Sequence, residues 1–85
     1  MSTSKGVKHQ AKDLFDKHIR LSHSLDDLEM LDALLPRDAS VLRALQAYCM
    51  GEAQKAMEAG HHIEGRRFGN LARQAQKLAD KADRR

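Results

Sequence analysis

Apolar residues recur at steps of three and four along most of the chain, the spacing that places side chains on one face of an α-helix. Three interruptions divide this pattern, which therefore predicts four helices, at residues 7–21, 25–34, 39–59 and 63–83. β-Branched residues are few, and this disfavours strands. We expect an all-α fold, with residues 1–6 as a disordered polar tail and residues 7–85 as a single helical domain.

The expected helix ends coincide with residues that favour them. Ser24 and Asp38 stand before the second and third apolar runs, where a short polar side chain can cap a helix N-terminus. Pro36 ends the second helix, because the residue before a proline is pushed out of the helical region. Gly60 stands where the third helix would end in a left-handed residue.

The third and fourth helices are long, and the connection between them is short, which makes them antiparallel neighbours. In this hairpin Cys49 is expected to lie opposite Ala72, and the two shorter N-terminal helices are expected to pack across it. Glycine inside a helix costs about 1 kcal/mol relative to alanine, so interior glycines indicate the close approach of a backbone or a bulky side chain. These glycines are Gly51, Gly65 and Gly69.

The segment GHHIEGRRFGNLA, from Gly60 to Ala72, is a near miss of a phosphate-binding loop. Such a loop needs a lysine and a hydroxyl residue after its glycines, and it follows a strand. Here Arg66 and Arg67 occupy those positions, and nothing upstream has the pattern of a strand. We interpret the segment as the bend of the helical hairpin and expect no nucleotide or other cofactor.

No group of side chains has the spacing of a catalytic or metal centre. His9 with Asp13, and His61 with Glu64, are spaced as helical metal ligands but lack a third member. Cys49 lies on the apolar stripe of the third helix, where a lone cysteine usually belongs to the core. We expect a protein that is not an enzyme and that takes no metal and no small-molecule substrate.

The length and the cysteine content indicate a small protein of a reducing compartment. A chain of 85 residues buries only about 60–65% of the surface that its unfolded form exposes, so self-association would help its stability. A single cysteine excludes an internal disulfide. Because the sequence has no long apolar run and no secretion signal, we expect a cytoplasmic protein that does not span a membrane.

The apolar surface predicts a protein partner. The second helix is apolar over a wide arc, and the hairpin carries apolar residues beyond one narrow stripe. Uncovered apolar surface of this kind marks a partner or a second copy. The favoured function is a non-enzymatic protein–protein interaction module, an adaptor, small chaperone or inhibitor that binds another helix or forms a homodimer. The residues predicted to carry the interaction are Leu28, Leu31, Leu35, Leu42, Leu45 and Tyr48.

The net charge of +3 is unevenly distributed and suggests an alternative function. Residues 1–24 carry five Lys or Arg and two acids, residues 25–60 three and seven, and residues 61–85 seven and three. In the last helix the cations lie opposite the apolar seam, as in a stripe that follows phosphates, although Asp80 and Asp83 dilute it. Nucleic-acid binding is therefore the alternative. Its predicted contacts are Arg66, Arg67, Arg73, Lys77 and Lys81.

Overall fold

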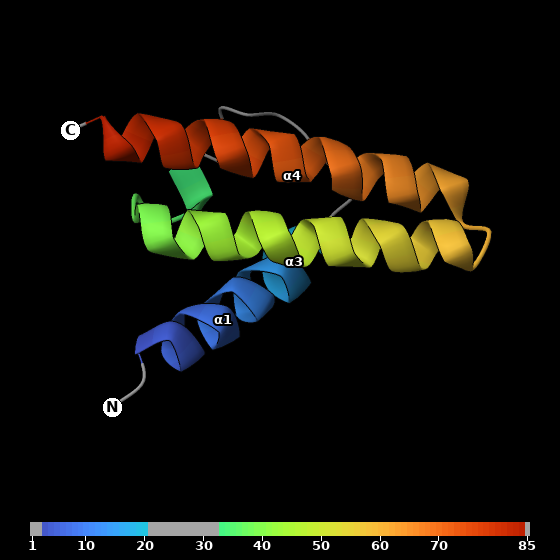
Figure 1. Cartoon of the computed structure of the whole chain (residues 1–85), viewed down its shortest axis with the longest axis horizontal. Helices are drawn as coiled ribbons and strands as arrows, with labels where there is room; N and C mark the ends of the chain where they lie inside the picture. The colour runs from blue at the N-terminus through green and yellow to red at the C-terminus, as the bar shows by residue number, and fades with distance from the viewer. Residues whose placement is uncertain (1–2, 21–32, 85) are drawn as a thin grey trace.

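Helices make up most of the described part of the chain. A computed structural model describes residues 3–20 and 33–84, and these contain no strand, which confirms the all-α prediction. The elements are α1 (Thr3–Leu14), the π-helix η1 (Phe15–Arg20), α3 (Ala39–Glu58) and α4 (His62–Asp83) (Figure 1). The predicted second helix, residues 25–34, lies outside the described residues except for its last two, which are helical.

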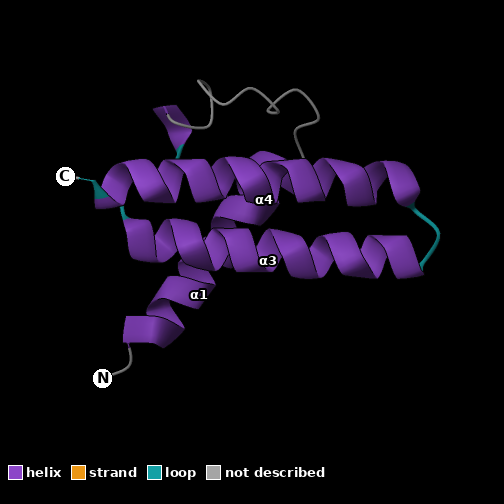
Figure 2. Ribbon diagram, turned by 45° about the horizontal axis from the view of Figure 1, so that its top comes forward, coloured by secondary structure: helices purple, strands orange, loops and turns teal. Residues whose placement is uncertain are grey.

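α3 and α4 run antiparallel and side by side, as Figures 1 and 2 show from two directions. Asp38 is the N-cap of α3, and its Oδ1 accepts hydrogen bonds from the backbone N–H groups of Ser40, at 2.9 Å, and Val41, at 3.5 Å. Both N–H groups belong to the first turn, which offers them no intrahelical acceptor. The predicted cap is confirmed.

Gly60 closes the turn between the two long helices with a left-handed φ of 85°. The N–H of His61 donates to the carbonyl of Ala56 at 2.7 Å, and the N–H of Gly60 donates to that of Met57 at 3.1 Å. This pair of bonds is the Schellman arrangement, which satisfies carbonyls at the end of a helix. A left-handed φ costs a residue with a Cβ roughly 1–2 kcal/mol, and glycine avoids this cost. The observed φ and hydrogen bonds confirm the prediction that Gly60 ends the helix.

The core consists of apolar side chains from α1, η1, α3 and α4, together with Leu35. The ring of Phe15 meets the rings of Tyr48 and Phe68 edge-on, at centroid distances of 5.0 and 5.1 Å. These three rings belong to η1, α3 and α4, so one aromatic cluster connects all three elements. The other buried apolar residues are Ala11, Leu35, Val41, Leu42, Leu45, Cys49, Leu71, Ala72, Ala75, Leu78 and Ala79.

The N-terminal helix differs from its prediction at both ends. α1 begins at Thr3, so residues 3–6 are helical where a disordered tail was expected. A nucleated helix gains one hydrogen bond for each added residue, and it therefore extends beyond Val7, where the apolar stripe starts. From Phe15 onward the backbone adopts the wider i→i+5 bonding of a π-helix rather than continuing as an α-helix.

Of the three interior glycines, only Gly65 is closely approached. A Cβ at Gly65 would lie 2.6 Å from Met57 Sδ and 3.2 Å from the carbonyl oxygen of Ala53. A Cβ at Gly51 or Gly69 would meet nothing within 4 Å, so the prediction was wrong at both positions. Close approach requires a glycine that faces the neighbouring helix, and only Gly65 is buried against α3.

Candidate functional site

Several residues predicted to bind a partner belong to the core instead. Leu35, Leu42 and Leu45 are 6%, 2% and 1% exposed, so in this structure they pack within the chain and do not face outward. Leu28 and Leu31 lie outside the described residues. The hydrophobic pattern locates the apolar face of a helix, but it does not say which part of that face a neighbouring helix covers.

A groove of about 600 Å³ lies between α1 and α3. Its lining consists of Lys8, His9 and Lys12 on α1 and of Ala44, Ala47 and Tyr48 on α3. We call it the α1–α3 groove. Tyr48, the last of the predicted partner residues, is partly buried here, and its ring forms a T-shaped pair with that of Phe15. The two alanines leave the floor open because their side chains are small.

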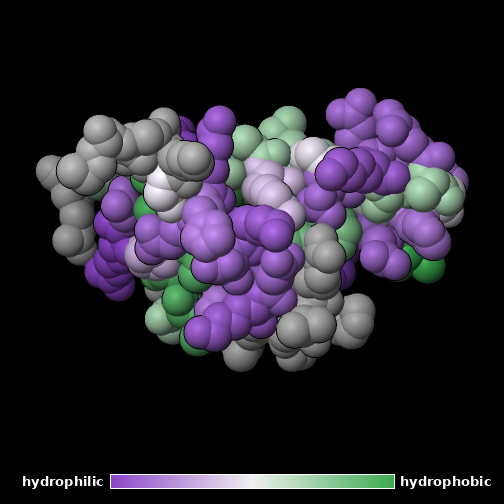
Figure 3. Space-filling model, turned by 90° about the horizontal axis from the view of Figure 1, so that it is seen from below, coloured by the Kyte–Doolittle hydropathy of each residue, from purple (hydrophilic) through white to green (hydrophobic). Residues whose placement is uncertain are grey.

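The α1–α3 groove combines a small apolar floor with a basic edge. Lys8 and Lys12 are both exposed, one helical turn apart on α1. His9 lies beside them, with its Nε2 3.6 Å from a carboxylate oxygen of Asp13. Seen from the α1 side, the molecule is mostly hydrophilic, and its apolar surface forms separate small patches (Figure 3). An apolar floor with such an edge suits a ligand that is itself amphipathic and acidic.

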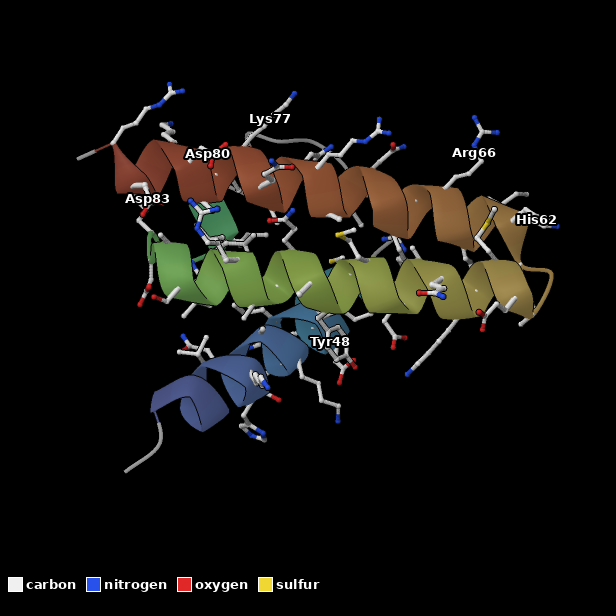
Figure 4. The ribbon with its side chains drawn as sticks, in the orientation of Figure 1. Tyr48, His62, Arg66, Lys77, Asp80 and Asp83 are labelled. Atoms are coloured by element: carbon white, nitrogen blue, oxygen red, sulfur yellow. The ribbon has the colours of Figure 1, made fainter. Side chains whose placement is uncertain are left out.

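α4 carries a row of cations on the side that faces away from α3. Its members, Arg66, Arg73, Lys77 and Arg84, are all exposed, and we call them the basic row. Figure 4 shows Arg66 and Lys77 pointing away from α3. Steps of seven, four and seven residues keep the four side chains on one narrow face of the helix.

Two other predicted nucleic-acid contacts lie outside the basic row. Arg67 is partly buried, with its guanidinium carbon 5.8 Å from the centroid of the Phe68 ring. Lys81 is exposed, and it lines a small hollow together with Pro36 and Leu78. Three of the five predicted contacts therefore lie in the row, together with Arg84, which the spacing of the sequence also places on this side of the helix.

The acidic residues near the end of α4 pair with a cation of α3. Arg43 contacts Asp80 at 3.4 Å and also forms an ion pair with Asp83, which lies on the side of α4 next to α3 in Figure 4. Asp83, and after it Asp80, raise the pKa of the Arg43 guanidinium above its ordinary value. All three side chains are about half exposed, so these pairs contribute little stability. Arg43 offsets part of the negative charge of these two carboxylates, although Asp80 also lies beside the basic row, three residues after Lys77 and four before Arg84.

Cys49 is buried in the core with an exposed fraction of 0%. Burial, with a smaller effect of the Glu52 carboxylate, raises the pKa of its thiol to about 12. A thiol acts as a nucleophile only in its thiolate form, and this one stays protonated near neutral pH. The structure thus places Cys49 as a core residue, in agreement with its position on the apolar stripe.

The turn of the hairpin exposes two histidines and one large apolar side chain. His61 and His62 are exposed, and Ile63 beside them is 86% exposed. Within residues 3–20 and 33–84, no three His, Cys, Asp or Glu side chains come together in a way that could hold a metal ion. The other large apolar residues that are exposed are Leu34, Met50 and Met57.

The described helices include none that is long and apolar enough to cross a bilayer. Comparison of the chain with models of protein families, with curated proteins and with solved structures finds no match. A functional assignment therefore has to come from the chemistry of the α1–α3 groove and of the basic row.

Proposed function

We propose that the protein is a non-enzymatic interaction module that binds an acidic amphipathic helix of a partner protein in the α1–α3 groove. The observation that carries this proposal is the pairing of an open, largely apolar floor with a basic edge in one groove of about 600 Å³. Helices that bind in grooves place apolar side chains on the floor and polar ones at the edges. Binding a partner's helix is a step that adaptors, small chaperones and inhibitors share.

The basic edge specifies the charge of the partner. Lys8 and Lys12 are four residues apart on α1. Carboxylates that are also four residues apart lie on one face of a partner helix, so each could pair with one of these lysines. Like charge at this edge would disfavour a basic helix, and electrostatic complementarity of this kind gives an interface its specificity and its rate of association.

The floor provides the apolar contact. Ala44 and Ala47 are three residues apart on α3 and so share a face. Their small side chains leave room for the larger apolar residues of a partner, and Tyr48 adds an aromatic ring to the lining. Tyrosine is enriched where a protein surface binds another, because its ring is apolar and its hydroxyl is polar. Of the residues that the sequence predicted, Tyr48 belongs to this lining.

The proposal is tested with a synthetic amphipathic acidic peptide. A fluorescent peptide of about 18 residues carries leucine on one helical face and glutamate elsewhere. We expect it to bind, with its affinity at least about tenfold lower for Lys8→Glu/Lys12→Glu and for Ala47→Glu, measured by fluorescence anisotropy. All three residues are exposed, so the changes leave the core intact. A peptide with glutamine in place of glutamate should bind more weakly to the unchanged protein.

The matched control reverses two charges elsewhere. Arg73→Glu/Lys77→Glu, on α4, changes the net charge by the same amount and should leave peptide binding unchanged. Equal loss in both double variants, or no binding to the unchanged protein, would refute the proposal. The homodimer predicted from the sequence is decided separately by sedimentation of the protein without peptide, where occupation of the groove by a second copy would appear as a dimer that Ala47→Glu abolishes.

A further inference from the structure

The basic row of α4 is a second charged surface, on a different element from the α1–α3 groove. From Arg66 to Arg84 it extends over roughly 27 Å at 1.5 Å per residue. Arg66, Arg73, Lys77 and Arg84 are exposed, and none of them forms an ion pair with a described residue. Four long cationic side chains in a straight line form a surface for a ligand whose negative charges also repeat along a line.

The acidic residues of α4 lie toward its two ends, so the middle of the basic row has neutral neighbours. Asp80 and Asp83 both contact Arg43 at one end of the hairpin, and Asp80 also lies beside Lys77 and Arg84, three and four residues away. Glu64 lies in the first turn of the helix, close to the hairpin turn. Between these ends, the exposed residues beside the row include Asn70 and Gln76, which are neutral amides. The field of the row is therefore positive toward solvent.

The neighbouring side chains distinguish between classes of polyanion. A membrane surface would favour large apolar side chains beside the cations. Among the described residues of α4, however, Ile63, near the hairpin turn, is the only large apolar residue that is exposed. Single-stranded nucleic acid favours exposed aromatic rings for stacking, but Phe68 is buried. Duplex DNA requires neither, and its major groove of about 12 Å admits an α-helix.

We infer that α4 binds double-stranded DNA through its basic row, with phosphate contacts from Arg66, Arg73, Lys77 and Arg84. Binding of this kind releases counterions and does not depend on base sequence. Asn70 lies within the groove of about 310 Å³ that Arg73 and Lys77 also line, so a polar amide lies next to the phosphate contacts. This inference does not rest on the α1–α3 groove, which lies between other elements.

Salt dependence provides the test. A fluorescent 20-bp duplex of mixed sequence is titrated with the full chain from about 50 to 200 mM salt. Four phosphate contacts predict a slope of log affinity against log salt near −3.6, or a loss of affinity on the order of 100-fold over this range. Arg73→Gln/Lys77→Gln should make the slope shallower by about 1.8, because each contact contributes about 0.9.

The control removes two charges from elements other than α4. Lys17→Gln/Lys55→Gln, at exposed positions of η1 and α3, changes the net charge equally and should keep the slope of the unchanged protein. Circular dichroism checks that both variants remain helical. No binding at 50 mM salt, the same change of slope in both variants, or binding to anionic phosphatidylserine vesicles but not to the duplex would each overturn the inference. Peptide binding in the α1–α3 groove is measured separately, so either result can fail without the other.

Discussion

At the scale of single residues, Gly65 and Gly69 show how position decides the role of a glycine. Both lie in α4 four residues apart, but only Gly65 has Met57 and Ala53 where a Cβ would stand. Gly69→Ala should raise the free energy of unfolding by roughly 1 kcal/mol, because alanine favours the helix and meets open space. Gly65→Ala gains the same propensity, but overpacking costs about 1–3 kcal/mol. We expect it to be neutral or destabilising by up to about 2 kcal/mol in urea denaturation.

The Met57 side chain provides the control for this pair. Met57 is 44% exposed, and in a Met57→Ala background the closest atoms to a new Cβ at position 65 are gone. Gly65→Ala should then recover part of its cost, whereas Gly69→Ala should behave as before. Equal stabilisation by the two alanines in the unchanged chain would contradict the close approach at Gly65.

Cys49 links burial to the pH dependence of stability. Its pKa in the folded protein is about 12, above the ordinary value of 9.0. The unfolded chain therefore loses the thiol proton first as the pH rises, and stability present below pH 9 is lost between pH 9 and about 12. The slope is at most about 1.4 kcal/mol per pH unit for one proton.

Two measurements check this prediction for Cys49. Urea denaturation across this pH window should show the decline, and Cys49→Ala should lack the part that belongs to the thiol. A disulfide reagent at pH 8 should label the native protein only as fast as the core opens. Rapid labelling without unfolding would show that the thiol is accessible.

At the scale of elements, the sequence predicted the two ends of α3 better than it predicted the type and bounds of the N-terminal helix. Asp38 and Gly60 act locally, through bonds to backbone groups two to four residues away, so their effect can be recognised without the rest of the fold. The π-helix from Phe15 onward could not be predicted, because apolar steps of three and four suit an α-helix equally well. In the fold Phe15, the first residue of this π-helix, packs against rings of α3 and α4.

Phe15 connects the N-terminal elements to the hairpin. It is 0% exposed, and its ring contacts both Tyr48 and Phe68. Phe15→Ala should cost about 3–5 kcal/mol, as large core truncations do, and it should loosen α1 and η1 before the hairpin. Hydrogen exchange should show protection lost first in residues 3–20.

The matched control for this change is Tyr48→Phe, which keeps the ring contact and removes only a hydroxyl. It should leave the exchange of α1 nearly unchanged. Uniform loss of protection across both α1 and the α3–α4 hairpin in Phe15→Ala would show instead that the described helices open as one unit.

At the scale of the whole molecule, the sequence predicted the apolar and basic faces but not what covers them. Leu42 and Leu45 belong to an apolar stripe, and only the placement of other elements shows that this part of it is core. Asp80 and Asp83 weaken the cationic character of α4 in sequence, but Arg43, nearly forty residues earlier, attracts both in the fold. The α1–α3 groove likewise depends on two segments far apart in the chain. Pairings of this kind are set by tertiary packing, which local periodicity does not contain.

Ligand-linked stability tests the proposed partner and its alternative, a second copy, in one experiment. A ligand that binds only the folded state stabilises it by RT ln(1 + [L]/Kd), about 2.7 kcal/mol at a hundredfold excess over Kd. We expect this increase with the acidic peptide, and its loss in Lys8→Glu/Lys12→Glu, measured by thermal and urea denaturation. Without peptide, a second copy of the protein would act as the ligand, and stability would then rise with protein concentration. A midpoint that rises with protein concentration alone and is unaffected by peptide would show that the groove takes a second copy rather than a partner's helix.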